Sequence, residues 1–300
     1  MKQRMKQAFE AITLAVAVVG GAQAQNMNPR DVDALRSDPP KLVAHYGPGP
    51  LQVGELRLPA GVGPFPVVVV VHGGCWTKGF ATARNTAALA TALTGMGFAT
   101  WNIEYRQIGD SGAGWPGTFQ DWAAATDYLR ELAKSQPLDL GHVAVVGHSA
   151  GAHAALWIAS RGKISASSVV GAARPLPIQV AVAIDGPGEL APFVGYDAEV
   201  CGRPVIVPFM DGSPKDQPAR YHIATPLALL PVHAKEYLVA SVVLTSDAAE
   251  HYRTIAKREG QYVEVLNVHD GGHFDIIAPG SKAWGDQVEP FLRKALEHDR

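Results

Sequence analysis

Five consecutive valines at positions 67–71 constrain the fold more than any other feature of the chain. An unbroken β-branched run of this length is typical of a strand that a parallel sheet buries on both faces. Other short apolar segments are predicted to be strands, and the Ala-rich or amphipathic segments between them are predicted to be helices. The predicted strands cover residues 51–58, 67–71, 98–105, 143–146, 178–184, 237–240 and 262–268. The predicted helices cover residues 82–96, 119–134, 150–158, 247–258 and 283–297.

This alternation of strands and helices predicts an α/β fold with a mostly parallel central sheet and helices on both faces. Residues 51–58 alternate with period two, as a half-exposed edge strand does, and residues 26–50 are expected to be an irregular lead-in. The proline-rich residues 186–228 are predicted to be a short cap-like insertion over one end of the sheet. Ligands of such sheets bind beyond the carboxyl ends of the strands, so chemistry is sought there.

Composition excludes several classes of protein. A chain of 300 residues with 47% hydrophobic and 18% charged residues is not a coiled coil, a collagen or a disordered protein. Its 26 basic and 28 acidic residues give a net charge of −2, and no basic cluster interrupts the balance. We therefore expect no nucleic-acid partner. Two cysteines are too few for a disulfide scaffold.

The N-terminus is typical of a secretory signal peptide. Three basic residues precede an apolar run at 11–20, and small residues stand at Ala22 and Ala24. The run is shorter than the ~20 residues that span a bilayer. We expect residues 1–24 to be removed, which leaves residues 25–300 as a single domain. That product is expected to be secreted or periplasmic, with no stable membrane association.

The first chemical motif is Gly-His-Ser-Ala-Gly at residues 147–151, between a predicted buried strand and an Ala-rich helix. A serine hydroxyl is a weak nucleophile unless it is held exposed beside a base. A sharp strand-to-helix turn holds it so, and flanking glycines let neighbouring backbone approach closely. The motif predicts that Ser149 is a nucleophile.

The second motif is His-Gly-Gly-Cys-Trp at residues 72–76, immediately after the valine strand. Attack by a serine on a carbonyl builds negative charge on oxygen, which inward-pointing backbone amides stabilise. Glycines after a strand let the main chain turn its amides inward, and Ala150 adds an amide at a helix N-terminus. We expect His72 to brace this loop and not to act as the base.

Together the two motifs resemble the α/β-hydrolase superfamily, and more closely its carboxylesterase and kynurenine-formamidase-like branch. The resemblance extends from about Leu56 to Phe291. It implies an oxyanion hole formed by the amides of Gly74, Cys75 and Ala150. Relatives of the lipase type carry a third glycine where this chain has Cys75, but an amide is still available there.

The same resemblance implies the base. Family members place the catalytic histidine after the last strand in a Gly-His-Phe-Asp setting, which here is His273. His269, Asp270 and His273 lie in a glycine loop that lacks the regular spacing of a helical metal site, so no metal is expected.

The acid that orients the base is left open by the sequence. Relatives carry an Asp just after the strand predicted at 237–240, but no carboxylate stands there. Asp185, at the tip of the strand predicted at 178–184, is favoured, because some α/β-hydrolases take their acid from that earlier tip. Asp247 keeps the usual order and is the alternative, although it also suits a helix-cap role. A Ser149–His273 dyad without either carboxylate is the third arrangement.

Four further residues near the predicted strand tips carry expectations. Trp76 and Trp115 are predicted to be walls of the substrate pocket. Cys75 and Cys201 either form a bridge, which an oxidising compartment would permit, or remain two small buried thiols.

The sequence therefore predicts a serine hydrolase that cleaves a carboxylic ester through an acyl-enzyme and requires no cofactor. An arylformamide or amide hydrolase is the alternative within enzymes, because the same groups serve both reactions. A catalytically silent binding protein on the same fold is the alternative from another class. The expected partner is a small ester or amide, and the oligomeric state is left open.

Overall fold

The computed structural model describes residues 26–297 and contains one eight-stranded sheet in the order β1-β2-β4-β3-β5-β6-β7-β8. The first three strands in this order pair antiparallel, and all later pairs are parallel. The strands are β1 (Leu42–His45), β2 (Val53–Arg57), β3 (Phe65–Val71), β4 (Ala99–Ile103), β5 (Leu138–His148), β6 (Val180–Ile184), β7 (Lys235–Ala240) and β8 (Val263–Asn267). The predicted α/β-hydrolase fold is confirmed.

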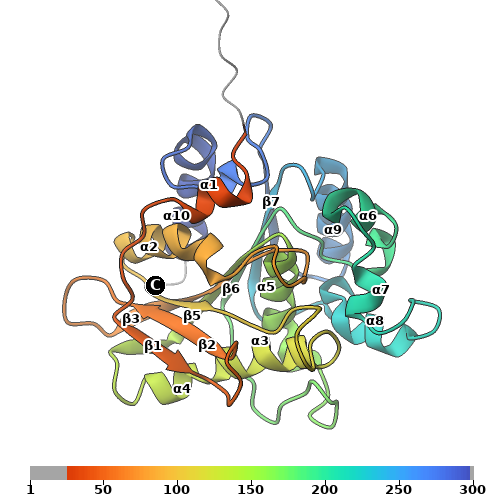
Figure 1. Ribbon diagram of the computed structural model, residues 1–300, viewed down its shortest axis with the longest axis horizontal. Coiled ribbons are helices and arrows are strands. Elements are labelled where there is room, and N and C mark those ends of the chain that lie inside the picture. The colour runs from red at the N-terminus through yellow and green to blue at the C-terminus, as the bar shows by residue number, and fades with distance from the viewer. Residues whose placement is uncertain (1–25, 298–300) are drawn as a thin grey trace, which may run out of the picture.

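Helices cover both faces of this sheet. The helices are α1 (Pro29–Asp33), α2 (Ala87–Gly95), α3 (Gly117–Asp127), α4 (Leu129–Leu132), α5 (Ala150–Ser160), α6 (Tyr196–Cys201), α7 (Ile206–Phe209), α8 (Pro218–Ala224), α9 (Ser246–Arg258) and α10 (Glu289–Glu297). Residues of α1, α2 and α10 share one apolar layer, and those three helices lie together in Figure 1. Residues of α3, α5 and α9 pack on the opposite face.

The valine strand β3 supplies both layers of the core. Val67, Val69 and Val71 pack with α3 and α5, whereas Val68 and Val70 pack with α2 and α10. Successive side chains of a strand point to opposite faces, so an all-valine strand is stable only where both faces are covered. This explains why the five valines alone predict a strand at the centre of the sheet.

The lead-in at 26–50 is not irregular, which corrects the expectation from sequence. It contains α1 and the edge strand β1, so β2 is the second strand of the sheet. Asn28 caps α1, since its side chain accepts hydrogen bonds from the amides of Arg30 and Asp31 and the Asp31 carboxylate accepts one from the Asn28 amide. β1 has only four residues, so its alternation is too short to stand out in the sequence.

The insertion at 186–228 contains three short helices, α6, α7 and α8, between β6 and β7. In Figure 1 they lie together on the side of the molecule where α9 is. The buried carboxylate of Asp197 accepts hydrogen bonds from the amides of Gly195, Val205 and Ile206. The helices have only 6, 4 and 7 residues, which is too short for a hydrophobic periodicity to stand out in the sequence.

The predicted signal peptide, residues 1–24, lies outside the described residues. Within residues 26–297, no helix has the length and apolar character that crossing a bilayer requires.

Candidate active site

Ser149 lies in a sharp turn between β5 and α5. Its backbone angles, φ 57° and ψ −120°, are rarely adopted by a residue with a side chain. A Cβ atom added to Gly147 would lie 1.8 Å from the carbonyl oxygen of Gly151, so the motif glycine is required by the close approach of its neighbour. The turn predicted from the motif is therefore present, and Ala150 begins the helix that follows.

His273 and Asp185 form a hydrogen-bonded pair beside this turn. Asp185 directly follows β6, and His273 lies in the loop after β8. Oδ2 of Asp185 is 2.7 Å from Nδ1 of His273, and the Asp185 side chain is fully buried. The structure thus brings together two residues that stand 88 positions apart.

Four backbone amides hold the Asp185 carboxylate. The amides of Ser241, Val243 and Leu244 donate to Oδ1, and the amide of Val242 donates to Oδ2, over 2.8–3.1 Å. These amides belong to the turn after β7, where the family resemblance places the acid itself. Charge-assisted bonds of this kind compensate a buried carboxylate for its lost hydration.

Asp247 is not brought to His273. It lies exposed in the first turn of α9, where a negative charge complements the positive end of the helix dipole. The cap of that helix is Thr245, whose Oγ1 accepts a hydrogen bond from the amide of Ala248. Of the two carboxylates that the sequence left open, only Asp185 contacts His273.

His148, which sequence reasoning did not single out, supports the His273 loop. Its Nε2 donates to the backbone carbonyl of His273 over 2.8 Å, and the two rings lie 4.3 Å apart. Burial, reinforced by repulsion from His273, lowers the pKa of His148 well below its ordinary value. A neutral imidazole at this position keeps the donor role. The sequence carries no signal for this role of His148, because the residue before a motif serine has no pattern that marks it.

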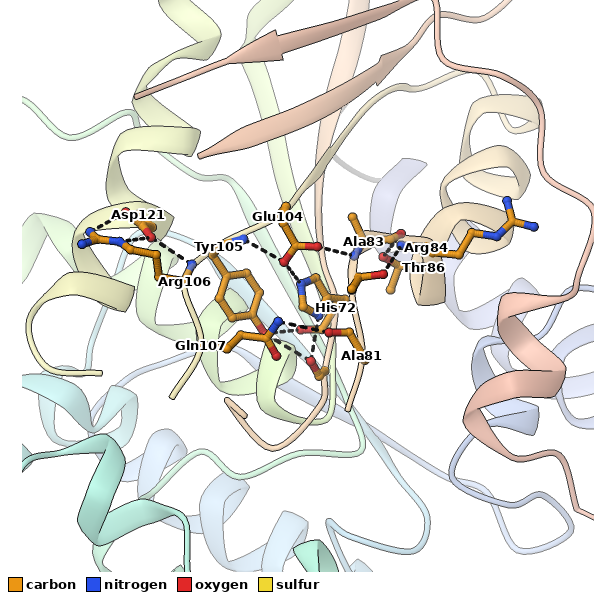
Figure 2. Close-up of polar contacts among 12 residues, drawn as sticks. His72, Ala81, Ala83, Arg84, Thr86, Glu104, Tyr105, Arg106, Gln107 and Asp121 are labelled. Carbon is orange, nitrogen blue, oxygen red and sulfur yellow. Dashed lines mark hydrogen bonds and ion pairs between the residues drawn. The ribbon is translucent and has the colours of Figure 1, made fainter. Parts of the chain in front are cut away.

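The loop after β3 is braced by His72, as expected from sequence. Figure 2 shows His72 beside Glu104, and Nε2 of His72 lies 2.8 Å from Oε1 of Glu104. On the other side of the ring, Nδ1 donates to the carbonyl of Gly73. The ring of His72 also stacks on Tyr105 at 4.3 Å. Glu104 accepts further bonds from the amides of Ala83 and Tyr105. Burial opposes ionisation of Glu104, but His72 and these amides outweigh it and lower the pKa of the carboxyl.

The backbone of this loop takes an uncommon path. Gly74, Cys75 and Trp76 have successive φ values of 102°, 53° and 51°. Cys75 is bonded to Cys201 at the end of α6, which decides between the bridge and the two thiols that the sequence left open. The hydroxyl of Thr77 donates to the carbonyl of Cys75 and adds a local restraint.

Ser149, His273, Gly74 and Cys75 line one pocket of about 200 Å³ at the carboxyl edge of the sheet. Ala150, the third residue of the predicted oxyanion hole, is the buried first residue of α5 beside it. The pocket also has apolar walls that sequence reasoning missed. These walls come from Pro29, Phe80, Ala81, Val200 and Phe274.

The two tryptophans predicted to be pocket walls are placed elsewhere. Trp76 is 2% exposed and stacks on Phe209 at 5.0 Å, because the left-handed backbone at 75 and 76 carries its ring into the aromatic core. Trp115 is half-buried and packs against Phe119 at 5.1 Å. Neither is among the residues that line the pocket with Ser149.

No set of three or more His, Cys, Asp or Glu side chains within residues 26–297 is grouped as a metal site would be. His269 and Asp270, which precede His273 in its loop, are both exposed.

Comparison with known families decides the relationship of the chain. The BD-FAE family matches residues 56–240, which is more than half of the sequence. The chain belongs to the BD-FAE family. The match includes the loop after β3, Ser149 and Asp185, and it ends at Ala240, before the loop that carries His273.

Several solved structures similar to this BD-FAE chain are named as esterases. A truncated carbohydrate esterase from gut microbiota has a TM-score of 0.69 and 17% identity, and the alignment covers 87% of this chain and 98% of that one. Esterase B from Lactobacillus rhamnosis, inhibited by a tributyrin phosphonate, has a TM-score of 0.73 and 17% identity over 90% of each chain. An esterase from Thermogutta terrifontis has a TM-score of 0.67 and 15% identity, over 86% of this chain and 94% of that one.

At these identities the structural similarity shows a shared fold. A search of curated proteins found no match. The fold and the family confirm the predicted α/β-hydrolase relationship and identify an esterase-like hydrolase. The formamidase-like branch stays a prediction.

Proposed function

We propose that the protein is a serine esterase in which Ser149, His273 and Asp185 form the catalytic triad. The observation that carries the proposal is the 2.7 Å bond between His273 and the buried Asp185, made beside the pocket that Ser149 and His273 share. A third group that orients the base is the signature of an activated nucleophile. The lack of a carboxylate after β7 favoured a catalytically silent protein, but in this proposal Asp185, directly after β6, takes the place of that carboxylate.

In the proposed mechanism each group has one step. With Nδ1–H of His273 donating to Asp185, Nε2 is the nitrogen that accepts the Ser149 proton as Oγ attacks the acyl carbon. The amides of Gly74, Cys75 and Ala150 stabilise the oxyanion that forms. His273 then protonates the departing alcohol, and water activated by the same histidine releases the acyl group from Ser149.

Covalent labelling tests the nucleophile. A fluorophosphonate probe should label the wild-type protein but not Ser149→Ala, and His273→Ala should be labelled far more slowly. Ser111→Ala, which changes an exposed serine outside the pocket, is the matched control and should be labelled like the wild type. Absence of an adduct on folded wild-type protein would overturn the proposal.

Turnover tests the bond that is cleaved. p-Nitrophenyl esters of rising acyl length, run beside N-formylkynurenine, should show ester hydrolysis as the faster reaction, since the pocket has apolar walls and the similar solved structures are named as esterases. A strong preference for the formamide would show that the protein is an amide hydrolase and not an esterase.

We also propose that the protein is exported and that residues 1–24 are removed. The bridge between Cys75 and Cys201 supports an oxidising compartment, because cytosolic thiols are kept reduced. N-terminal sequencing of the protein recovered outside the cytoplasm should begin near residue 25, and an intact residue 1 would contradict the proposal.

A further inference from the structure

A second pocket, of about 340 Å³, lies between the segment that follows β6 and the turn that follows β7. Its walls include Pro187, Phe193, Tyr196, Val243 and Leu244. Because both segments leave the carboxyl ends of their strands, this second pocket opens on the same edge of the sheet as the pocket that contains Ser149.

Backbone segments that form the walls of the second pocket also contact residues of the proposed triad. Gly186 packs so closely on Ser149 that an added Cβ would lie 2.0 Å from the Ser149 carbonyl oxygen. Pro187, the next residue, lines the second pocket. On the opposite wall, Val243 and Leu244 are residues whose amides hold the carboxylate of Asp185. The second pocket is therefore built on the same segments that fix the nucleophile and the acid.

Helix α6 forms a wall of both pockets. Val200 lines the pocket with Ser149, and Tyr196, one helical turn earlier, lines the second pocket. The last residue of α6, Cys201, is bonded to Cys75 in the loop after β3. This bond fixes the helix between the two pockets.

The second pocket is mostly apolar but contains one acidic group. Phe193 and Tyr196 pack edge to face at 5.1 Å, and Tyr196 keeps 37% of its surface exposed. The half-buried side chain of Glu189 lies among these apolar walls, where burial raises the pKa of its carboxyl. The imidazole of His251, an exposed side chain that also lines the second pocket, lies 3.8 Å from the Glu189 carboxylate. A carboxylate in such surroundings accepts a hydrogen bond from a ligand and repels an anion.

We propose that the second pocket is a substrate subsite. It binds a mostly apolar part of the ester that carries no negative charge and is remote from the bond that is cleaved. Phe193, Tyr196 and Leu244 contact the apolar body of this group, and Glu189 accepts a hydrogen bond from a hydroxyl or amino substituent on it. This inference rests on the proposed esterase function and adds the class of group that the enzyme selects.

Filling the pocket tests the subsite. Ala248→Trp places a ring at its exposed rim, and His233→Trp places the same ring at the rim of an unrelated pocket lined by Ile178 and Val232. Both variants should hydrolyse p-nitrophenyl acetate like the wild type. On esters with a bulky apolar acyl or alcohol part, Ala248→Trp alone should lose about tenfold or more in kcat/KM. Equal rates for all three proteins on the bulky esters would overturn the subsite.

Tyr196→Ala provides a second variant that removes a wall instead of filling the space. It should lower kcat/KM for the bulky esters and leave the acetate reaction unchanged. Failure of the subsite leaves acetate hydrolysis intact in every variant, whereas failure of the proposed function leaves no hydrolysis to compare.

The role of Glu189 is tested with matched bulky esters whose distal end is a methyl, a hydroxymethyl or a carboxylate group. The wild type should disfavour the carboxylate by about tenfold and favour the hydroxymethyl ester over the methyl ester. Glu189→Gln should reduce the discrimination against the carboxylate and leave the acetate reaction unchanged. An unchanged ranking in Glu189→Gln would refute the part assigned to Glu189.

Discussion

Oδ2 of Asp185 lies 2.7 Å from Nδ1 of His273, although β7 separates the strand that carries Asp185 from β8, which leads to His273. The tip of β7 contributes backbone amides where the family resemblance places a carboxylate. In the proposed triad the acid therefore follows β6 instead of β7, and the turn after β7 holds its carboxylate through backbone amides. The proposal thus needs no Asp after β7.

Asp185→Asn should reduce kcat by as much as ~10⁴, because the amide no longer fixes the tautomer of His273 or stabilises its charged form. It should also lower the free energy of unfolding by about 2–3 kcal/mol, since the four amides lose their ionised acceptor. Steady-state kinetics and urea unfolding measure the two effects.

Asp247→Asn is the matched control for that prediction. Asp247 is exposed on α9 and does not cap the helix, so its replacement should leave kcat near normal and cost at most about 1 kcal/mol of stability. The reverse pattern would move the acid to Asp247. Full activity in both variants would favour a dyad of Ser149 and His273.

The features that the sequence predicted correctly are those that depend on a local pattern of residues. The valine run specified a doubly covered strand, and the Gly-His-Ser-Ala-Gly motif specified the strained turn at Ser149, because both depend on neighbouring residues alone. The choice between Asp185 and Asp247 depends on where the turn after β7 lies relative to the His273 loop, which only the folded chain determines. The bridge from Cys75 to Cys201 depends in the same way on the path of the insertion.

Trp76 shows a different limit of sequence reasoning. A large aromatic residue beside a glycine loop at a strand tip suggested a pocket wall. The left-handed backbone at Cys75 and Trp76 instead directs the ring toward Phe209 in the core. Glycine is the residue type that indicates a positive φ in a sequence, so left-handed backbone at a cysteine and a tryptophan could not be predicted.

Cys201→Ala should lower kcat by about tenfold, because the amide of Cys75 then relies on a left-handed backbone without its covalent anchor. Loss of the bridge, which closes a long loop, should also destabilise the protein by about 2–4 kcal/mol. A trifluoromethyl ketone, which binds as an oxyanion, should lose affinity in parallel with kcat. A reducing agent should slow the wild type and leave the variant unaffected, and equal turnover of the two proteins would contradict the positioning role.

Glu104→Gln should weaken the brace on the same loop from its other side. Glu104 joins His72 to the amides of Ala83 and Tyr105, so its neutralisation removes the charged acceptor of three hydrogen bonds in the core (Figure 2). We expect a loss of about 3 kcal/mol in the free energy of unfolding and a smaller fall in kcat than for Asp185→Asn. Glu131→Gln, at an exposed ion pair with Lys134 on the surface of α4, should cost less than about 1 kcal/mol. Similar losses in the two variants would show that the brace contributes nothing beyond an ordinary ion pair.

Glu236 should make stability depend on pH. It is buried on β7 and accepts a hydrogen bond from the hydroxyl of Tyr252, and burial raises the pKa of its carboxyl to about 8. In the unfolded chain the carboxyl ionises near its ordinary value of 4.5. Between these two values the folded state binds the extra proton, so the free energy of unfolding falls as pH rises, by up to about 1.4 kcal/mol per pH unit.

Glu236→Gln removes this titration, because the glutamine side chain is neutral at every pH. The variant and the wild type should have similar stability at pH 5, and the variant should be the more stable by pH 8. Glu259→Gln, at an exposed position after α9, should reproduce the wild-type dependence. Because the remaining groups titrate alike in the three proteins, the difference between urea unfolding curves at pH 5, 6.5 and 8 reports Glu236 alone. Parallel wild-type and Glu236→Gln profiles would mean that Glu236 is already ionised in the folded protein.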